Sequence, residues 1–309
     1  MKKIFLLFAA VAMSAGVMFA QDINEATENY NNGAMELQMG NKEAALANFQ
    51  TALTMAEALG DEGADIVANC KTTIPAIMSS IAKDLIKAES YDAAVEQLNK
   101  TIETADLYNA ADIADECKEL IPTVYLSQGN SLLKAKNVAG AVEALKKSLE
   151  LNPSNGMAAL LLGQSLTAQG KIAEAEAAYL QAAENGMESK AKQALSKMYI
   201  KLAQASLKAK KAQEAYDYAV KATSFAEEAN AYNFAARAAQ QLGKNAECIS
   251  NFEKYLQLNP TAKDAAGVKF TIAALYQQAG NKAKAKEFYQ MVSNDAQYGP
   301  SAQDQLKTL

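Results

Sequence analysis

A spacing of 34 residues, found between residues 122 and 187, constrains the fold more than any other feature of this sequence. Three pairs of residues show it: Gly129 and Gly163, Ala141 and Ala175, and Leu145 and Tyr179. A fixed period of this length is typical of helical repeats, in which each unit is a pair of helices that buries its apolar face against neighbouring units. The spacing therefore predicts an all-α fold, an α-solenoid built from helix pairs.

A second internal duplication lies upstream, with an offset of 47 residues. Residues 64–100 match residues 111–147, and both copies contain an Ile-Pro dipeptide, at Pro75 and Pro122. The 13 residues beyond the 34-residue period precede each proline, so we expect them to lengthen the first helix of the pair. Because proline lacks a backbone N–H and clashes with the preceding turn, we expect it to kink or restart that helix. Residues 184–195 add about six residues to the period, which predicts a looser joint there.

The composition favours helix and offers no general attraction to polyanions. Half of the 309 residues are hydrophobic, with only 5 Pro and 15 Gly, a balance that suits helices better than sheets. A chain of this length accommodates two globular domains or one solenoid. Because the formal net charge is −5, we expect no nucleic acid partner.

The sequence contains no histidine and none of the common catalytic motifs. Histidine is absent, which removes the usual general base near neutral pH and the commonest metal ligand. There is no glycine-rich phosphate loop, no Cys-x-x-Cys pair and no Asp-rich calcium loop. Adjacent carboxylates such as Asp115-Glu116 and Glu227-Glu228 are typical of solvated helix faces, since neighbouring helical residues do not converge on one point. The sequence thus predicts a protein that is not an enzyme and has no catalytic residue, cofactor or metal site.

The three cysteines are expected to be free thiols. Cys70 and Cys117 occupy equivalent positions in successive units. Stacked helices are roughly 8–10 Å apart, whereas the Cα atoms of bridged cysteines lie within about 7 Å. Cys248 stands at a position that otherwise carries alanine, so we expect it to act as a small buried apolar group.

Residues 1–20 have the features of a signal peptide. Lys2 and Lys3 form a basic n-region, an apolar stretch runs from Ile4 to Met18, and Ala20 supplies a small residue for cleavage. The alternative is a membrane anchor, but the apolar run is shorter than the about 20 residues of a spanning helix and no stop-transfer flank follows. We expect an exported chain, periplasmic or secreted after cleavage. Its mature part, residues 21–309, is not expected to insert stably into a membrane.

The recurring small residues resemble those of the tetratricopeptide repeat family, whose 34-residue unit has small residues at its eighth and twentieth positions. Aligned on that pattern, the units begin near Ala26, Pro75, Pro122, Gly156, Ser196, Ala229 and Ala266. The eighth positions hold Gly33, Ala82, Gly129, Gly163, Ala203, Ala236 and Ala273. The twentieth positions hold Ala45, Ala94, Ala141, Ala175, Ala215, Cys248 and Ala285. These sites are expected where two helices cross, because a larger side chain would force the axes apart.

The sequence departs from the family pattern at a few positions. Thr101, Ser148, Tyr255 and Val292 replace the small twenty-seventh residue, and Ala219 replaces the large twenty-fourth. The resemblance nevertheless covers nearly all of residues 21–309. It implies about seven helix pairs and a C-terminal capping helix, arranged as a right-handed superhelix.

The resemblance also implies that the first helices of the units line a concave groove through their second, fifth, ninth, twelfth and thirteenth positions. The candidate peptide-binding residues at such positions are Asn130, Lys134, Gln164, Gln204, Lys208, Asn233, Arg237, Gln240 and Gln241. The apolar members are Leu126, Leu133, Leu160, Ile200 and Phe270. Amides and a few cations suit the backbone and carboxylate groups of an extended peptide.

These observations together favour an exported, non-enzymatic scaffold that binds protein or peptide segments in the cell envelope through its groove. Two alternatives stay open. The first is a structural subunit of an envelope or outer-membrane-associated complex, recruited by its convex face or edges. The second is an accessory to a separate enzyme or sensor chain. No motif in the sequence names the partner, because a repeat fold of this kind hosts many functions.

Overall fold

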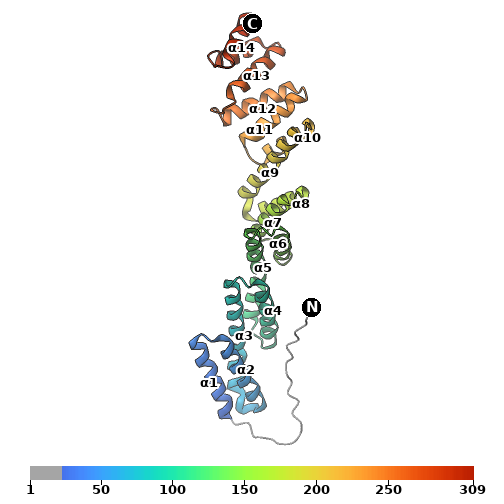
Figure 1. Cartoon of the computed structure of the whole chain (residues 1–309). Helices are drawn as coiled ribbons and strands as arrows, with labels where there is room; N and C mark the ends of the chain where they lie inside the picture. The colour runs from blue at the N-terminus through green and yellow to red at the C-terminus, as the bar shows by residue number, and fades with distance from the viewer. Residues whose placement is uncertain (1–22) are drawn as a thin grey trace. The chain divides into compact units, whose positions relative to one another are not determined.

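The computed structural model describes residues 23–309, which form fifteen α-helices and no strand (Figure 1). The predicted signal peptide, residues 1–20, lies outside the described residues. The helices pair in chain order as an all-α solenoid, in agreement with the predicted fold class. The handedness of the superhelix stays a prediction.

The first compact unit extends to Val124. Its helices are α1 (Ile23–Met39), α2 (Lys42–Ala58), α3 (Ala64–Lys87), α4 (Tyr91–Leu107) and the first half of α5 (Ala111–Lys134). A single turn of 3-10 helix, Gly60–Gly63, joins α2 to α3. The core between them is built from Phe49, Leu53, Ile74, Ile77 and Met78, with the Tyr30 ring edge-on to Phe49 at 5.2 Å.

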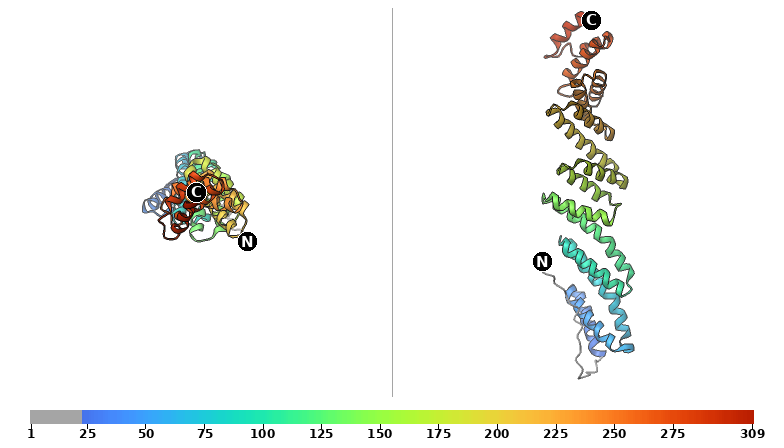
Figure 2. Two further views of the ribbon diagram at one scale, coloured as in Figure 1. Left: turned by 90° about the horizontal axis from the view of Figure 1, so that it is seen from above. Right: turned by 90° about the vertical axis from the view of Figure 1, so that its right-hand side faces the viewer.

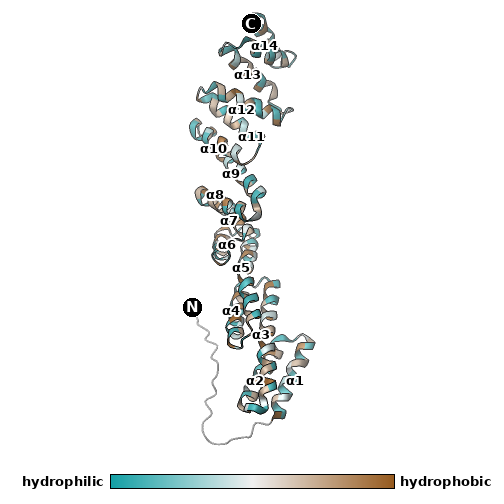
Figure 3. Ribbon diagram, turned by 180° about the vertical axis from the view of Figure 1, so that it is seen from behind, coloured by the Kyte–Doolittle hydropathy of each residue, from teal (hydrophilic) through white to brown (hydrophobic). Residues whose placement is uncertain are grey.

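The second compact unit extends from Tyr125 to Leu309. After the second half of α5 it contains α6 (Val138–Leu151), α7 (Gly156–Ala168), α8 (Ile172–Ala182), α9 (Glu188–Lys208), α10 (Ala212–Phe225), α11 (Ala229–Gln241), α12 (Asn245–Leu258), α13 (Ala265–Gln278), α14 (Lys282–Met291) and α15 (Gly299–Thr308). Figure 2 shows the hairpins following one another within each unit. Polar and apolar residues both occur along each helix (Figure 3), as expected of amphipathic helices with one face in a core.

Seven helix pairs turn at the same position of their units. The fifteenth residue has a positive φ in each of them: Gly40, Glu89, Lys136, Gly170, Lys210, Gly243 and Gly280. A single residue in this left-handed conformation ends a helix and reverses the chain. Glycine adopts it without steric cost, which explains why it fills four of the seven turns.

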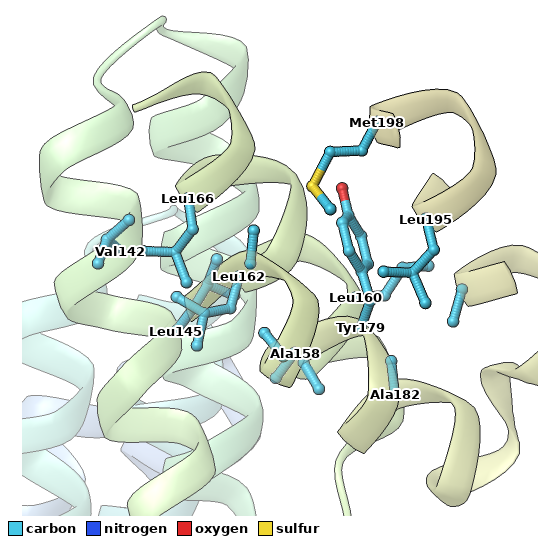
Figure 4. Close-up of a cluster of buried hydrophobic side chains, with 14 of the residues drawn as sticks. Val142, Leu145, Ala158, Leu160, Leu162, Leu166, Tyr179, Ala182, Leu195 and Met198 are labelled. Carbon is cyan, nitrogen blue, oxygen red and sulfur yellow. The ribbon is translucent and has the colours of Figure 1, made fainter. Parts of the chain in front are cut away.

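The predicted crossings of small residues are confirmed. All seven eighth-position and all seven twentieth-position residues are buried. A Cβ added to Gly163 would lie 2.6 Å from the Tyr179 ring, and one added to Gly129 would lie 2.7 Å from Leu145 Cγ. The eighth residue therefore packs against the twenty-fourth of the same unit. Figure 4 shows Tyr179 in this core, with its ring directed toward Met198.

The proline-containing helices differ in part from the expectation. The residues before each proline do lengthen the first helix, since α3 and α5 each contain 24 residues. Pro75 and Pro122 lie inside these helices and neither ends its helix, so the restart does not occur, and the kink stays a prediction. Pro75 and Ile74 are almost fully buried, and this packing offsets the one backbone hydrogen bond that proline removes.

The helix is interrupted after α8, where a looser joint is predicted. Residues Ala183–Met187 form a π-type turn, in which Asn185 and Gly186 leave the helical conformation and Gly186 has a φ of 84°. The chain then enters α9, whose 21 residues include eight that precede the unit beginning at Ser196.

All three cysteines are buried free thiols. Burial raises the pKa of Cys70 and of Cys248 to about 11, and burial also raises the pKa of Cys117. Because the thiolate is the reactive form, these side chains behave as small apolar groups at neutral pH.

Candidate functional site

A shallow groove between α9 and α11 brings together six of the nine candidate residues. Its volume is about 430 Å³. The lining consists of Gln204, Leu207 and Lys208 from α9, and Asn233, Phe234, Arg237, Gln240 and Gln241 from α11. We call this surface the α9–α11 groove.

Helical spacing explains why these side chains face the same space. Gln204 and Lys208 are four residues apart on α9. Asn233, Arg237 and Gln241 are likewise four apart on α11. Residues at this interval lie above one another on a helix, so each helix presents one polar row to the groove.

Asn233 and Asp264 hold Arg237 in place at the groove. The Arg237 Nε donates a hydrogen bond to Asn233 Oδ1 at 2.6 Å, and its Nη2 lies 2.9 Å from Asp264 Oδ2. Asp264 stands directly before α13, and its other oxygen accepts a hydrogen bond from the Tyr255 hydroxyl at 2.6 Å. One polar network thus joins α11, α12 and α13 and orients the guanidinium without a ligand.

The same network changes two pKa values. Burial acts to raise the pKa of Asp264, but the hydrogen bonds from Tyr255 and Arg237 outweigh it and hold that pKa below its ordinary value. Burial, followed by the bond to Asp264, raises the pKa of Tyr255 to about 12. At neutral pH the network therefore consists of an ionised carboxylate between a guanidinium and a neutral phenol.

The groove presents several hydrogen-bond donors and acceptors to solvent. Its amides each offer donors and an acceptor, and a guanidinium has five N–H donors, of which the two bonds above use two. Lys208 is exposed, and Arg237 is half exposed. Residues 23–309 contain no group of three or more His, Cys, Asp or Glu placed to hold a metal ion.

Three candidate residues lie outside the α9–α11 groove. Asn130 and Lys134 are exposed near the end of α5, and Gln164 is exposed on α7. They occupy first helices, as expected, but they do not line this hollow. Any ligand that reaches them must extend along the solenoid beyond α9.

The apolar positions are less open than expected. Leu160 was expected to line the groove, but it is 5 % exposed and belongs to the core around Tyr179, so that expectation is wrong. Leu126, Leu133 and Ile200 are half-buried against the same core. Phe270 packs against Tyr289 and Tyr298, at 5.3 and 5.5 Å between ring centroids. Internal packing between neighbouring repeats takes up these side chains.

Two lining residues were missed by the sequence reading. Leu207 occupies the twelfth position of its unit, so the positional rule already pointed to it. Phe234 occupies the sixth position, which the rule does not include. Both are half-buried and supply the apolar part of the groove.

A second hollow, of about 550 Å³, lies between α12 and the turn that joins α13 to α14. It includes Glu253 and Tyr276, whose hydroxyl donates to Glu253 Oε1 at 2.9 Å. Burial, and then the bond to Glu253, raises the pKa of Tyr276 to about 12. None of its residues was a candidate, and the Tyr276 hydroxyl and the Glu253 carboxylate are bonded to one another.

The described helices are not built to cross a bilayer. Within residues 23–309 none combines the length and the apolar character that a membrane span needs.

Two protein-family models match the sequence, and both are described as tetratricopeptide repeat. One matches residues 126–190 and the other residues 229–261. The second match begins at Ala229, where the alignment of small residues places the start of a unit. A comparison with curated proteins gives no match.

Solved structures with helical repeats are similar to this chain at low sequence identity. YrrB, described as a TPR protein with an unusual peptide-binding site, is 20% identical; 65% of this chain and 97% of that chain are covered, with a TM-score of 0.36. The C-terminal part of a TPR repeat-containing protein from Cytophaga hutchinsonii is 17% identical, with 74% and 99% covered and a TM-score of 0.37. The family models identify tetratricopeptide repeats at residues 126–190 and 229–261.

Proposed function

We propose that this chain, which is a tetratricopeptide repeat protein, is a non-enzymatic scaffold that binds an extended segment of a partner protein in the α9–α11 groove. Interaction with other proteins is what the repeat fold supports in general. The groove as the binding surface, and an extended segment as the ligand, are the parts that we add.

The observation that carries this proposal is the fixed orientation of Arg237. Its side chain is anchored by Asn233 and Asp264. The amide side chains of Gln204, Gln240 and Gln241 line the same groove. An oriented guanidinium loses less side-chain freedom when it binds a carboxylate or a carbonyl. Amides satisfy a peptide backbone whatever its side chains are, so the groove fits a segment of loosely specified sequence.

We further propose that the scaffold acts in the cell envelope after export. The support is the basic n-region and short apolar stretch of residues 1–20. N-terminal sequencing of the protein from its native cells is expected to begin at Gln21. Recovery of an intact Met1 from the membrane pellet would show that the segment is an anchor instead.

Site-specific photo-cross-linking in the native cells tests the groove. A photoreactive amino acid at Gln240 is expected to give a discrete adduct with a partner protein, because this side chain lines the groove. The matched position is Glu150, which is exposed on α6, a second helix of its pair. Adducts from Glu150 but not from Gln240 would contradict the groove and favour a structural subunit recruited by its outer face.

A further inference from the structure

The two compact units carry opposite net charge. Residues 23–124 contain 18 acidic and 6 basic residues, a net charge of −12. Residues 125–309 contain 16 acidic and 22 basic residues, a net charge of +6. The modest charge of the whole chain therefore hides a strong asymmetry, which is a sign of electrostatic association.

A row of four lysines on α9 concentrates the positive charge. The row, which we call the lysine stripe, consists of Lys190, Lys197, Lys201 and Lys208. Steps of 7, 4 and 7 residues keep them within about 20° of one line along the helix, over about 27 Å. All four are exposed, and the opposite side of α9 is buried through residues such as Leu195 and Tyr199.

The lysine stripe has no carboxylate partner among the described residues. Lys192, on another side of the same helix, is bonded to Glu188 at 2.6 Å. The stripe lysines form no such ion pair in residues 23–309. Four aligned charges that repel one another at this spacing raise the free energy of the isolated chain, and an acidic surface would relieve that repulsion.

An acidic row on α5 is the counterpart in the first unit. Asp112, Asp115, Glu116 and Glu119 follow the steps 3, 1 and 3, which place them on one face of the helix. All four are exposed, opposite the buried Ala114, Cys117 and Ile121. We call these four residues the acidic row.

The first unit has no spare cation with which to neutralise itself. Each lysine of residues 23–124 is already bonded to a carboxylate: Lys42 and Lys87 to Asp84, Lys71 to Glu57, Lys83 to Glu116, Lys100 to Glu96, and Lys118 to Asp115. Two members of the acidic row, Asp112 and Glu119, are in none of these pairs. Neutralisation of this surface therefore requires charge from outside the unit.

We propose that the lysine stripe of one copy docks on the acidic row of a second copy, so that chains associate head to tail. A second copy is the occupant that the charges select, because one sequence supplies both complementary surfaces. The contact joins two different patches, so each bound copy keeps one free stripe and one free row, and association continues beyond a dimer. Being electrostatic and exposed, it weakens as salt shortens the screening length from about 8 Å at physiological ionic strength to about 3 Å at 1 M.

Sedimentation velocity of the purified mature chain, residues 21–309, tests this proposal. At low ionic strength the weight-average mass is expected to rise with protein concentration, and in 1 M salt it is expected to return to that of one chain. A chain that stays monomeric at every concentration in low salt would overturn the proposal.

Neutral variants separate the stripe from charge in general. Lys190→Gln, Lys197→Gln and Lys201→Gln together are expected to abolish the rise in mass and leave the groove residue Lys208 in place. The matched control changes three exposed lysines of the second compact unit, Lys171, Lys282 and Lys286, to Gln. The control is expected to associate as the parent does, and an equal loss in both variants would overturn the proposal.

Charge reversal gives a second readout that does not depend on loss alone. A variant with Lys197→Glu and Lys201→Glu and another with Asp112→Lys and Glu119→Lys are each expected to be monomeric. Mixed in equal amounts they are expected to form a complex, since each retains one native surface. Circular dichroism establishes that both are folded, and folded variants that do not combine would overturn the proposal. The groove variant Gln204→Ala, Gln241→Ala changes no charged residue and is expected to self-associate as the parent does. Loss of self-association and loss of partner binding in the groove are therefore distinct results.

Discussion

Gly163 shows that a single Cβ atom can prevent close packing of the two helices of a pair. A Cβ at this position would lie 2.6 Å from the Tyr179 ring, which is itself 3 % exposed and held between α7 and α9. We expect Gly163→Leu to destabilise the fold by roughly 1–3 kcal/mol through overpacking. The measurement is the midpoint of urea denaturation.

The matched control for Gly163 is Ala168→Leu, at an exposed position of the same helix. It adds an equally large side chain without a crossing partner, so we expect a change within about 0.5 kcal/mol. An unchanged midpoint for Gly163→Leu would mean that the crossing is not where we place it.

The thiols give a prediction at the same scale. In the native chain at neutral pH, alkylation is expected to leave Cys70, Cys117 and Cys248 unmodified, because each is buried and its pKa is raised. Unfolding without a reductant is expected to expose three labels by mass spectrometry. A single label would establish a disulfide.

At the scale of elements, the register of the repeats could be predicted from the sequence because it depends on small side chains at a fixed spacing. Gly129, Gly163 and Ala203 must be small wherever they lie in the chain, so the sequence alone revealed the crossings. The restart predicted at Pro75 does not occur. The sequence shows the backbone hydrogen bond that proline removes, whereas the burial of Pro75 depends on the packing of α3.

The groove shows the limit of the same reading. The resemblance to the repeat family implied which residues of α9 and α11 line a groove, and the structure gathers six of the nine candidates there. The bond from Arg237 to Asp264 spans 27 residues and depends on how α13 begins against α11. No period in the sequence encodes that contact. The burial of Leu160 likewise follows from packing between neighbouring pairs.

The junction of α11, α12 and α13 is expected to depend on pH through Asp264. Its pKa is lowered in the folded chain, so the carboxylate stabilises the fold above its unfolded pKa of about 3.9 and loses that contribution as the pH falls through the folded value. We expect Asp264→Asn to lower the thermal midpoint at pH 7. The difference from the parent should shrink toward pH 3.

Asp304→Asn is the control for this prediction. Asp304 also pairs with a cation, Lys307, but both side chains are about three-quarters exposed, and such a pair contributes little. We expect no measurable change at either pH. A difference between Asp264→Asn and the parent that stays constant down to pH 3 would exclude ionisation of Asp264 as the cause.

At the scale of the whole molecule, the proposed binding surface and the core use different faces of the same helices. The core takes the crossings and most of the apolar side chains, whereas Gln204, Gln241 and Lys208 remain exposed along the groove. Each additional repeat therefore lengthens the binding surface without a new core, which suits a solenoid to extended ligands.

Because the groove residues lie outside the core, we expect binding of the partner identified by cross-linking at Gln240 to change without a change in stability. Gln204→Ala and Gln241→Ala together are expected to weaken binding of that partner, measured by calorimetry, because they remove two amides of the groove that could bond to a peptide backbone. The free energy of unfolding is expected to change by no more than about 0.5 kcal/mol, since both side chains are exposed. The thermal midpoint therefore stays close to that of the parent. We leave Arg237 unchanged in this variant because its removal would also strip Asp264 of an ion pair. The control is Lys146→Ala with Glu150→Ala on α6, outside the groove. If the α6 pair abolishes binding and the groove pair does not, the partner is held by the outer face and the groove proposal fails.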